Sequence, residues 1–338
     1  MTTTMQDKHG RFLRDLRISV IDKCNYRCPY CMPAEIFGAD YNFLTKEELL
    51  SQGELYRLAA LFAQLGVTKL RITGGEPLVR PGIVDIVRDF ATIPGIEDLA
   101  MTTNGYYLPK YARALKEAGL HRLTISFDSL DPEVYQIMNG RRATIDTVLA
   151  GLKAAEEAGF TRIKINSVVK KGVNDHTIVD LARHFKGTGH IVRFIEYMDV
   201  GNLNGWKLDD VVTADAILAA IDKEMPLEPI PPNYPGEVAT RFRYKDGSGE
   251  IGIIASVSKP FCGSCTRARL SSAGEYYTCL FAHTGTDLRT PLRQGASDDD
   301  LLALIGGVWQ KRTDRYSELR TSFTRLPEKG AEMYRLGG

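Results

Sequence analysis

The chain has 338 residues, 43% of them hydrophobic, and its 43 Lys and Arg nearly balance its 42 Asp and Glu. A chain of this size and composition can bury a full core, so it is neither disordered nor membrane-spanning. The near-zero net charge gives no overall attraction to nucleic acid. The polar start has no signal segment, and no run of about 20 apolar residues is present for a membrane helix. We therefore expect a cytoplasmic protein that binds neither membranes nor nucleic acid.

Short β-branched runs alternate with helical patterns up to about Met198, which is typical of repeated βα units around a parallel sheet or barrel. The expected strands are residues 15–21, 68–74, 97–104, 122–127, 162–169 and 191–198. The expected helices, with apolar residues at spacings of three and four, are residues 45–66, 82–92, 109–119, 143–159 and 176–186. Because six units are two fewer than a closed barrel needs, we predict an α/β fold with an incomplete (β/α)6 TIM-type barrel that is open along one side.

The pattern changes after Asp199. The expected elements there are a helix at residues 214–225, a Pro- and Gly-rich connection at 228–238, a hairpin within 239–257 that turns near 245–250, and a helix at 297–312 whose start is capped by Asp. We therefore predict a barrel core at residues 8–230 and a C-terminal segment at residues 231–338.

Six cysteines form two groups of three. The first trio is Cys24, Cys28 and Cys31, and the second trio is Cys262, Cys265 and Cys279. In a reducing cytosol an even number of cysteines favours metal ligands or redox chemistry over structural disulfides. Two separate metal sites are the simplest account. Judged alone, the second trio with His283 also has the spacing of a Cys3His zinc site.

Polar residues follow the expected strands at their carboxyl ends, where barrels of this kind place their chemistry. These residues are Cys24 after the first strand, Thr73–Pro77 (TGGEP) after the second, Thr102–Gly105 (TTNG) after the third and Ser126–Ser129 (SFDS) after the fourth, with Lys164 and Asn166 in the fifth strand and Met198 at the end of the sixth. If the barrel forms, one face collects them all.

The first trio, with Tyr30 before its last cysteine and Gly74-Gly75-Glu76-Pro77 after the second strand, resembles the radical S-adenosylmethionine (SAM) superfamily. The resemblance implies a 4Fe-4S cluster that is held by the trio and whose fourth iron is chelated by the methionyl group of SAM. It also implies that Gly75 lets the backbone approach the methionyl end. By the same resemblance, the backbone of Tyr30 and residues Ser126 and Met198 contact the adenine and ribose of SAM.

The second trio, followed by Arg267 and Arg269 in the run Cys-Thr-Arg-Ala-Arg, resembles the GTP 3',8-cyclase family of molybdenum cofactor biosynthesis. The resemblance runs from Arg17 to the terminal glycines. It implies a second 4Fe-4S cluster with an open iron that binds the guanine of GTP. His283 departs from this pattern, so a zinc site at the second trio stays an alternative. An alternative is another radical SAM enzyme with an auxiliary cluster, such as a peptide maturase, but those enzymes generally carry more C-terminal cysteines.

Several basic residues are expected to hold a triphosphate, because Arg grips its oxygens in paired hydrogen bonds. By resemblance the GTP contacts are Arg17, Arg71, Thr102, Lys164 and the segment Arg267, Ala268 and Arg269, with Lys69 as a helper. No residue is assigned a catalytic role, since the resemblance implies that the radical is generated on SAM.

The resemblance further implies the reaction and its partners. The radical removes hydrogen from C3' of GTP, and the carbon radical attacks C8 to give (8S)-3',8-cyclo-7,8-dihydroguanosine 5'-triphosphate, the first step of molybdopterin synthesis. The family suggests an electron donor, a homodimer and transfer of the product to cyclic pyranopterin monophosphate synthase. It also suggests that the tail ending in Gly337 and Gly338 inserts towards the active site.

Overall fold

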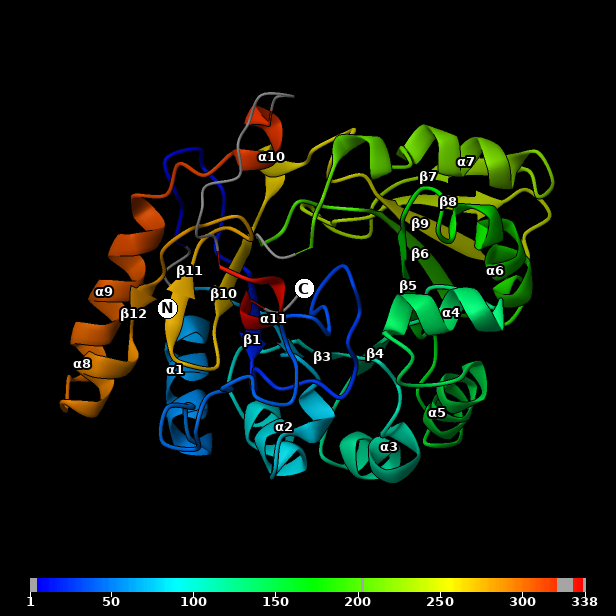
Figure 1. The fold of residues 1–338 in the computed structure, drawn as a ribbon. Coiled ribbons are helices and arrows are strands. Elements are labelled where there is room, and N and C mark those ends of the chain that lie inside the picture. The colour runs from blue at the N-terminus through cyan, green and yellow to red at the C-terminus, as the bar shows by residue number, and fades with distance from the viewer. Residues whose placement is uncertain (1–4, 202–203, 321–330, 337–338) are drawn as a thin grey trace.

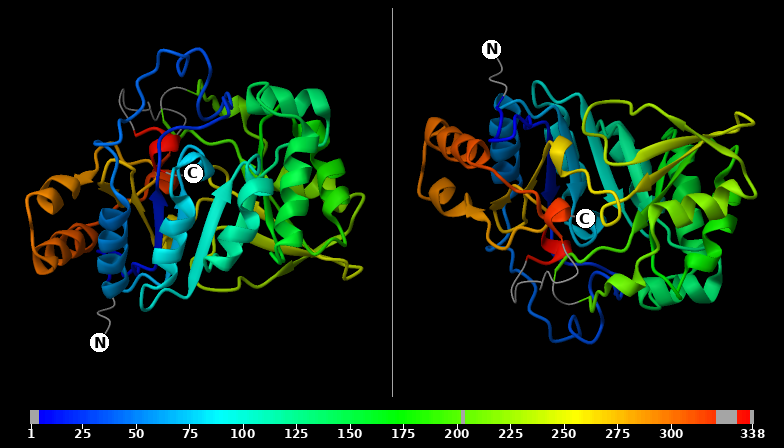
Figure 2. Two further views of the ribbon diagram at one scale, coloured as in Figure 1. Left: turned by 90° about the horizontal axis from the view of Figure 1, so that it is seen from below. Right: turned by 90° about the horizontal axis from the view of Figure 1, so that it is seen from above.

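The computed structural model describes residues 5–201, 204–320 and 331–336. All its strands belong to one sheet with the order β12-β11-β10-β1-β2-β3-β4-β5-β6-β9-β8-β7. This sheet curves around a central space, with helices along its outer side (Figure 1). Figure 2 shows the orange C-terminal part of the chain beside the blue start of the chain.

Six parallel strands form the middle of the sheet, as the sequence predicts. They are β1 (Asp15–Ser19), β2 (Lys69–Thr73), β3 (Asp98–Thr103), β4 (Arg122–Ser126), β5 (Lys164–Val169) and β6 (Ile191–Glu196). The C-terminal half adds one parallel strand at each edge, β10 (Arg267–Leu270) on β1 and β9 (Glu250–Ile254) on β6. Antiparallel strands follow outside them, namely β11 (Glu275–Tyr277), β12 (Thr286–Asp287), β8 (Thr240–Tyr244) and β7 (Leu227–Ile230). The barrel is therefore open, which confirms the predicted fold class.

The longer helices are α1 (Gln52–Gln64), α2 (Ile83–Ala91), α3 (Leu108–Glu117), α4 (Pro132–Asn139), α5 (Ile145–Glu157), α6 (Ile178–Phe185), α7 (Ala214–Asp222) and α9 (Asp298–Gln310). Helices α1 to α7 follow the six parallel strands along the chain, and α9 comes after β12. Shorter helices are α8 (Arg289–Arg293), α10 (Tyr316–Leu319) and α11 (Met333–Leu336), and the 3-10 turns are η1 (Pro77–Val79), η2 (Asp175–Thr177), η3 (Leu208–Asp210) and η4 (Cys262–Ser264). Within the described ranges, none of the helices is long and apolar enough to cross a bilayer.

Alternation along the strands separates the core from the interior of the barrel. In β1, Leu16 and Ile18 are fully buried in the hydrophobic core, whereas Arg17 between them lines a cavity. Successive side chains of a strand point to opposite faces, so the apolar face meets the helices and the polar face turns inward. β2 repeats this arrangement around Arg71. The arginines of β1 and β2 therefore enter the interior of the barrel from the face of the sheet opposite the core.

Two helix starts correct the predictions. The helix expected from residue 45 begins only at Gln52, because Ser51 and Glu54 form a capping box in which each side chain accepts from the other's backbone N–H. The sequence reading missed α4, whose start has Pro132 as its first residue and Asp131 as its cap. Its strong N-terminal signals, an acidic cap followed by Pro, were present but lay in a short segment.

The C-terminal predictions hold in outline. The hairpin is present as β8 and β9, but the expected connection at residues 228–238 begins with strand β7, which pairs with β8. The helix expected at residues 297–312 is α9, and its cap is Ser297 rather than an Asp, with Asp300 completing a capping box. Because of the Pro and Gly at residues 231–238, the sequence reading predicted a connection there and missed the short edge strand β7 just before them.

A close approach of backbones joins α5 to the loop after β3. A Cβ on Gly151 would lie 2.2 Å from the carbonyl oxygen of Gly105, which is closer than packed atoms allow. We predict that Gly151→Ala lowers the midpoint of thermal unfolding, because overpacking costs about 1–3 kcal/mol and outweighs the higher helix propensity of Ala.

Gly307 in α9 is the matched control, since a Cβ there meets nothing within 4 Å. Gly307→Ala should raise the unfolding midpoint, by up to about 1 kcal/mol of stability. The two variants are compared by calorimetry or circular dichroism. A Gly151→Ala protein that melts at or above the parent temperature would show that α5 can move away from the loop without cost.

Candidate functional site

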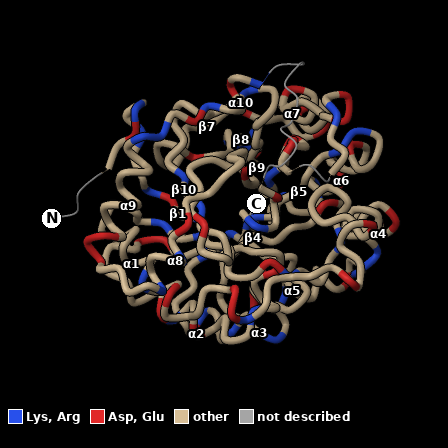
Figure 3. Tube along the Cα trace, turned by 60° about the vertical axis from the view of Figure 1, so that its left-hand side comes forward, with Lys and Arg blue, Asp and Glu red and all other residues tan. Residues whose placement is uncertain are grey.

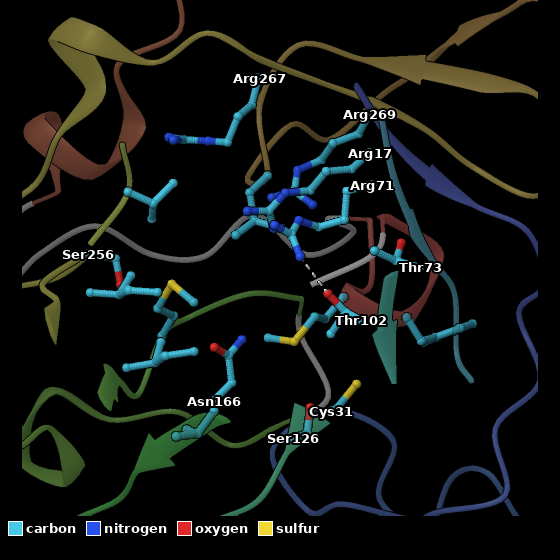
Figure 4. Close-up of a pocket in the computed structure, with 18 of the residues that line it drawn as sticks. Arg17, Cys31, Arg71, Thr73, Thr102, Ser126, Asn166, Ser256, Arg267 and Arg269 are labelled. Atoms are coloured by element: carbon cyan, nitrogen blue, oxygen red, sulfur yellow. Dashed lines mark hydrogen bonds between the residues drawn. The ribbon is translucent and has the colours of Figure 1, made fainter. Parts of the chain in front are cut away.

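One cavity inside the curve of the sheet is lined by both cysteine trios. All six cysteines are free and half-buried. Between the trios, the cavity wall carries arginines from β1, β2, β6 and β10. Figure 4 shows Cys31 and Ser126 at one side of this cavity, Arg267 at the other, and Arg17, Arg71 and Arg269 reaching into the space between. The structure thus brings together most of the residues that the sequence singled out.

The first trio lies in the loop after β1. The backbone N–H of Cys31 donates to the carbonyl oxygen of Cys28 at 3.0 Å, and the N–H of Tyr26 lies 3.3 Å from the sulfur of Cys24. Burial raises the pKa of Cys24 and Cys31 to about 12. Thiols in such surroundings become thiolates only if a nearby cation stabilises the charge. Three free cysteines of this kind fit a metal cluster that supplies that positive charge.

The glycine pair after β2 presses onto the start of the cysteine loop. A Cβ on Gly75 would lie 2.3 Å from the carbonyl oxygen of Lys23, and the N–H of Gly75 donates to Ile21 at 2.8 Å. Only glycine allows the two backbones to come this close. The observed neighbour of Gly75 is therefore the cysteine loop itself, and its contact with SAM stays a prediction.

Glu76 is a buried structural link. Its carboxylate accepts from the N–H of Leu78 at 3.0 Å, the N–H of Asn104 at 2.8 Å and the hydroxyl of Thr103 at 2.7 Å. Burial raises the pKa of Glu76 to about 7, against the lowering effect of these donors. The carboxylate ties the loop after β2 to the end of β3, which accounts for the residue without a catalytic role.

The residues expected to contact SAM all line the cavity. Gly75, Tyr30, Ser126 and Met198 do so, together with Asp128 and Asn166, to which no SAM role was given. The hydroxyl of Tyr30 donates to Asp128 at 2.9 Å, and burial raises the pKa of that carboxyl to about 7. Asp128 therefore orients the aromatic ring that stands between two cysteines of the first trio.

In the second trio, Cys262 and Cys265 lie in and just after η4, and Cys279 lies just after β11. The N–H of Cys265 donates to the carbonyl oxygen of Cys262 at 3.1 Å. Burial raises the pKa of Cys279 to about 11. Burial acts in the same direction on Cys265, but the charges of Arg267 and Arg312 outweigh it and lower the pKa of Cys265 to about 7. The charged groups around Cys265 therefore favour its thiolate, which those around Cys24 and Cys31 do not.

The spacing of the cysteines bears on what they could hold. Within the described ranges, no three His, Cys, Asp or Glu side chains are close enough together to hold a single metal ion. Each thiolate of a 4Fe-4S cube binds a different iron, so the cube accepts a wider spacing. His283 is exposed and is not among the residues that line the cavity.

Three arginines stand side by side on neighbouring strands. Arg17 on β1 is directly opposite Arg269 on β10 and Arg71 on β2 in the sheet register. Like charges at such positions repel, and the pKa of Arg17 is lowered by burial and by these two neighbours. We call these three residues the arginine row. Because a polyanion would stabilise these buried cations, the cavity between the trios favours a polyanionic ligand.

Two threonines, and a nitrogen of Arg267 that has no hydrogen-bond partner among the described residues, lie around the arginine row. A guanidinium nitrogen of Arg71 donates to the hydroxyls of Thr102 and Thr124, both at 3.2 Å. Figure 4 shows the bond to Thr102. Arg71 therefore does not form a carboxylate salt bridge at the barrel rim within the described ranges. Arg267 has a buried nitrogen with no partner there, which leaves a donor available to a ligand.

Some predicted GTP contacts lie away from the cavity wall. Lys164 and Ala268 are not among the lining residues, and Ala268 is fully buried in β10. Burial, and then the charge of Arg193, lower the pKa of Lys164 to about 7. Lys69 lines the cavity, but its ammonium already lies 2.8 Å from the hydroxyl of Tyr234.

Arg193 on β6 is a site residue that the sequence reading missed. It lines the cavity, and its Nε donates to the side-chain oxygen of Asn166 at 2.9 Å. Burial, and then the charge of Arg71, lower the pKa of Arg193 to about 9. The signal was a charged residue inside an otherwise apolar strand, which is the same signal that marked Arg17 and Arg71. Figure 3 shows basic positions on β1 and β10 near the middle of the molecule and mixed charges on the outer helices.

The C-terminal helix α11 closes part of this cavity. Met333 and Tyr334 line it, and Arg269 donates to the carbonyl oxygen of Leu336 at 3.0 Å. The hydroxyls of Tyr334 and Tyr41 lie 2.8 Å apart, which joins α11 to the segment after the first trio. Gly337 and Gly338, expected to insert towards the site, lie outside the described residues.

Comparison with known proteins agrees with this site. The Radical SAM superfamily model matches residues 18–185, and the Molybdenum Cofactor Synthesis C model matches residues 190–318. The fold resembles that of Streptococcus suis SuiB bound to its precursor peptide SuiA, with a TM-score of 0.64 and 16% identity over 96% of this chain and 73% of that chain. Fold and site together define a radical SAM enzyme.

Curated relatives narrow this class. A GTP 3',8-cyclase of Acidothermus cellulolyticus is 52% identical, with 95% of this chain and 90% of that protein covered. A GTP 3',8-cyclase of Xanthomonas campestris is 50% identical (99% and 97%), and one of Staphylococcus epidermidis is 49% identical (96% and 95%). The chain belongs to the GTP 3',8-cyclase family.

The two trios predict a definite metal content. Protein prepared without oxygen should carry roughly eight irons with equal acid-labile sulfide, as two 4Fe-4S clusters contain. Cys28→Ser and Cys265→Ser should each lose about half of this iron, because each removes a ligand from one trio only. Iron, sulfide and zinc analysis checks both statements. Tightly bound zinc without labile sulfide would contradict them.

Proposed function

We propose that this chain converts GTP into (8S)-3',8-cyclo-7,8-dihydroguanosine 5'-triphosphate with SAM, the first step of molybdenum cofactor biosynthesis. The observation that carries the proposal is the arginine row in one cavity between two cysteine trios. A guanidinium pairs with two oxygens of a phosphate at once, and three in register match the length of a polyphosphate. The relatives of about 50% identity named as GTP 3',8-cyclases support the same reaction.

The proposed cofactors follow from the cysteine ligands of the two trios. Cys24, Cys28 and Cys31 would hold one 4Fe-4S cluster, which when bound supplies the electron that cleaves SAM. Tyr30, Gly75, Ser126 and Met198 are proposed to bind SAM beside it. The second trio is proposed to hold a second 4Fe-4S cluster, and its free, half-buried cysteines beside cationic arginines support this.

The remaining residues bind and orient the substrate. Arg17, Arg71 and Arg269 face the triphosphate, and Thr102 fixes the direction of Arg71 through its hydroxyl. Arg267 contributes its unpartnered nitrogen. We add Arg193 to the predicted set, because it lines the cavity and Lys164 does not. Met333 and Tyr334 of α11 reduce access of water to the cavity, which radical chemistry requires.

The peptide-maturase alternative gains no specific support. The likeness to SuiB is at 16% identity and concerns the fold alone. A row of buried arginines suits an anionic substrate rather than an extended peptide backbone.

Several partners remain part of the proposal. We propose an external electron donor, a homodimer, a cytoplasmic location and transfer of the product to cyclic pyranopterin monophosphate synthase, on the basis of the family. The division into a core at residues 8–230 and a segment at residues 231–338 also stays a prediction.

The two trios should have separable tasks. Cys28→Ser should abolish reductive cleavage of SAM, because it removes a ligand from the trio beside Tyr30 and Gly75. Cys265→Ser should leave cleavage detectable but stop cyclisation, because it affects only the side of the cavity that holds the base. Chromatography of 5'-deoxyadenosine and of the nucleotide product measures both. Equal loss of cleavage in the two variants would contradict this division.

The proposed function is tested by following the hydrogen at C3' of GTP. With GTP deuterated at C3', deuterium should appear in the 5'-deoxyadenosine released from SAM, and mass spectrometry should identify the cyclised nucleotide. Unlabelled GTP and GTP deuterated at C8 are the controls and should give no transfer. A cyclised nucleotide formed together with 5'-deoxyadenosine that carries no deuterium would rule out the proposed abstraction.

A further inference from the structure

Arg312, two residues beyond α9, reaches the sulfur of the second trio. One guanidinium nitrogen donates to the sulfur of Cys265 at 3.2 Å, and the other donates to the carbonyl oxygen of Cys265 at 2.8 Å. The side chain is only 1% exposed. Its guanidinium lies over the ring of Trp309, 4.5 Å from the ring centroid. This arginine is therefore fixed in place with a charged N–H directed at a cysteine sulfur.

A second arginine, from the other end of the chain, completes this arrangement. Arg11 donates to the carbonyl oxygen of Cys262 at 2.9 Å. The carboxylate of Asp7 lies between the two arginines, 2.6 Å from Arg11 and 3.4 Å from Arg312, and is fully buried. We call Asp7, Arg11 and Arg312 the arginine clamp. The two arginines of the clamp thus bind the backbone carbonyl oxygens of two cysteines of the second trio.

Two carboxylates of unequal burial face the two buried guanidinium groups of the clamp. The side chain of Asp7 is fully buried, whereas that of Asp314, 3.4 Å from Arg312, is 32% exposed, so water screens its charge. A buried guanidinium is further stabilised by a buried anion beside it. The sulfur of Cys265 is at hydrogen-bond distance from Arg312 and becomes such an anion when it is a thiolate. The clamp therefore suits a thiolate that serves as a metal ligand.

The first trio has a different set of contacts. The sulfur of Cys24 receives a neutral backbone N–H from Tyr26 at 3.3 Å. Arg27 lies beside this trio, but it donates to the carbonyl oxygens of Cys24 and Tyr26, both at 2.8 Å, rather than to a cysteine sulfur. Among the described residues, a guanidinium N–H directed at a cysteine sulfur is found at the second trio.

We infer that Arg312 sets the reduction potential of the second cluster by donating a charged hydrogen bond to Cys265. This rests on the proposed function, since it requires a cluster on the second trio. Reduction adds negative charge to a cluster, and an N–H donor or cation beside a ligand sulfur stabilises that charge. The second cluster is therefore reduced at a less negative potential than it would be without Arg312. Arg312 is a positioning and tuning residue and need not touch GTP.

The test is a redox titration followed by electron paramagnetic resonance. In the Cys28→Ser background, which leaves the second cluster, adding Arg312→Gln should move the midpoint potential to a more negative value. Arg312→Lys keeps the charge but cannot bond both atoms of Cys265, so it should give a smaller shift. In the Cys265→Ser background, which leaves the first cluster, Arg312→Gln should change nothing.

Arg315→Gln is the matched control, because Arg315 lies three residues further on, is 47% exposed at its side chain and pairs with Glu318. It should leave both potentials unchanged. If Arg312→Gln loses the second cluster, the potential is measured in Arg312→Lys, where a shift to a more negative value supports the inference and an unchanged value contradicts it. An unchanged second potential with full iron, or equal shifts of both clusters, would overturn it. Parent protein that holds only one cluster would instead refute the proposed function at its second trio.

Discussion

The parallel pairing of β10 with β1 is the constraint on which the whole site depends. This pairing places Arg269 opposite Arg17 and so extends the arginine row across two segments that are far apart in sequence. It also positions the loop that precedes β10, which carries Cys262 and Cys265, above the same cavity that the loop after β1 enters. Without this one strand pair, the barrel would retain one trio and the arginines of β1, β2 and β6, but the second trio and Arg269 would not be held beside them.

The two trios then differ because of what surrounds them rather than because of their own spacing. Carboxyl groups from the ends of β2 and β4 lie near the first trio, together with Arg27, which donates to the carbonyl oxygen of Cys24. Guanidinium groups from β10 and from the segment after α9 lie near the second trio, and one of them donates to the sulfur of Cys265. In a buried site with few waters, such differences strongly affect how readily a sulfur carries negative charge. The protein can thus give two similar donor sets different chemical properties.

Much of this could be predicted from local sequence. The six core strands and their helices follow from alternation and from apolar spacing, and the cysteine spacing with the glycine pair indicates the superfamily. The β10–β1 pair could not be predicted, because no local pattern states which distant strand completes an edge. Arg193 was missed although it lies inside an apolar strand, as Arg17 does. Arg312 was missed because its role depends on Asp7 and Arg11, which sequence separates from it by almost the entire chain.

The arginine clamp joins the first residues of the chain to some of the last, and this has a consequence for biosynthesis. During synthesis on the ribosome, β1 and the first trio emerge early, but the strand that covers the open edge of β1 and the arginine that faces Cys265 emerge only near the end. Until then, the nascent barrel presents an unpaired parallel edge, which is a template for association with other chains. The edge of β1 can therefore be covered only after residues 267–270 have been made, and the clamp can close only after Arg312, so this protein depends on protection of its nascent chain late into translation.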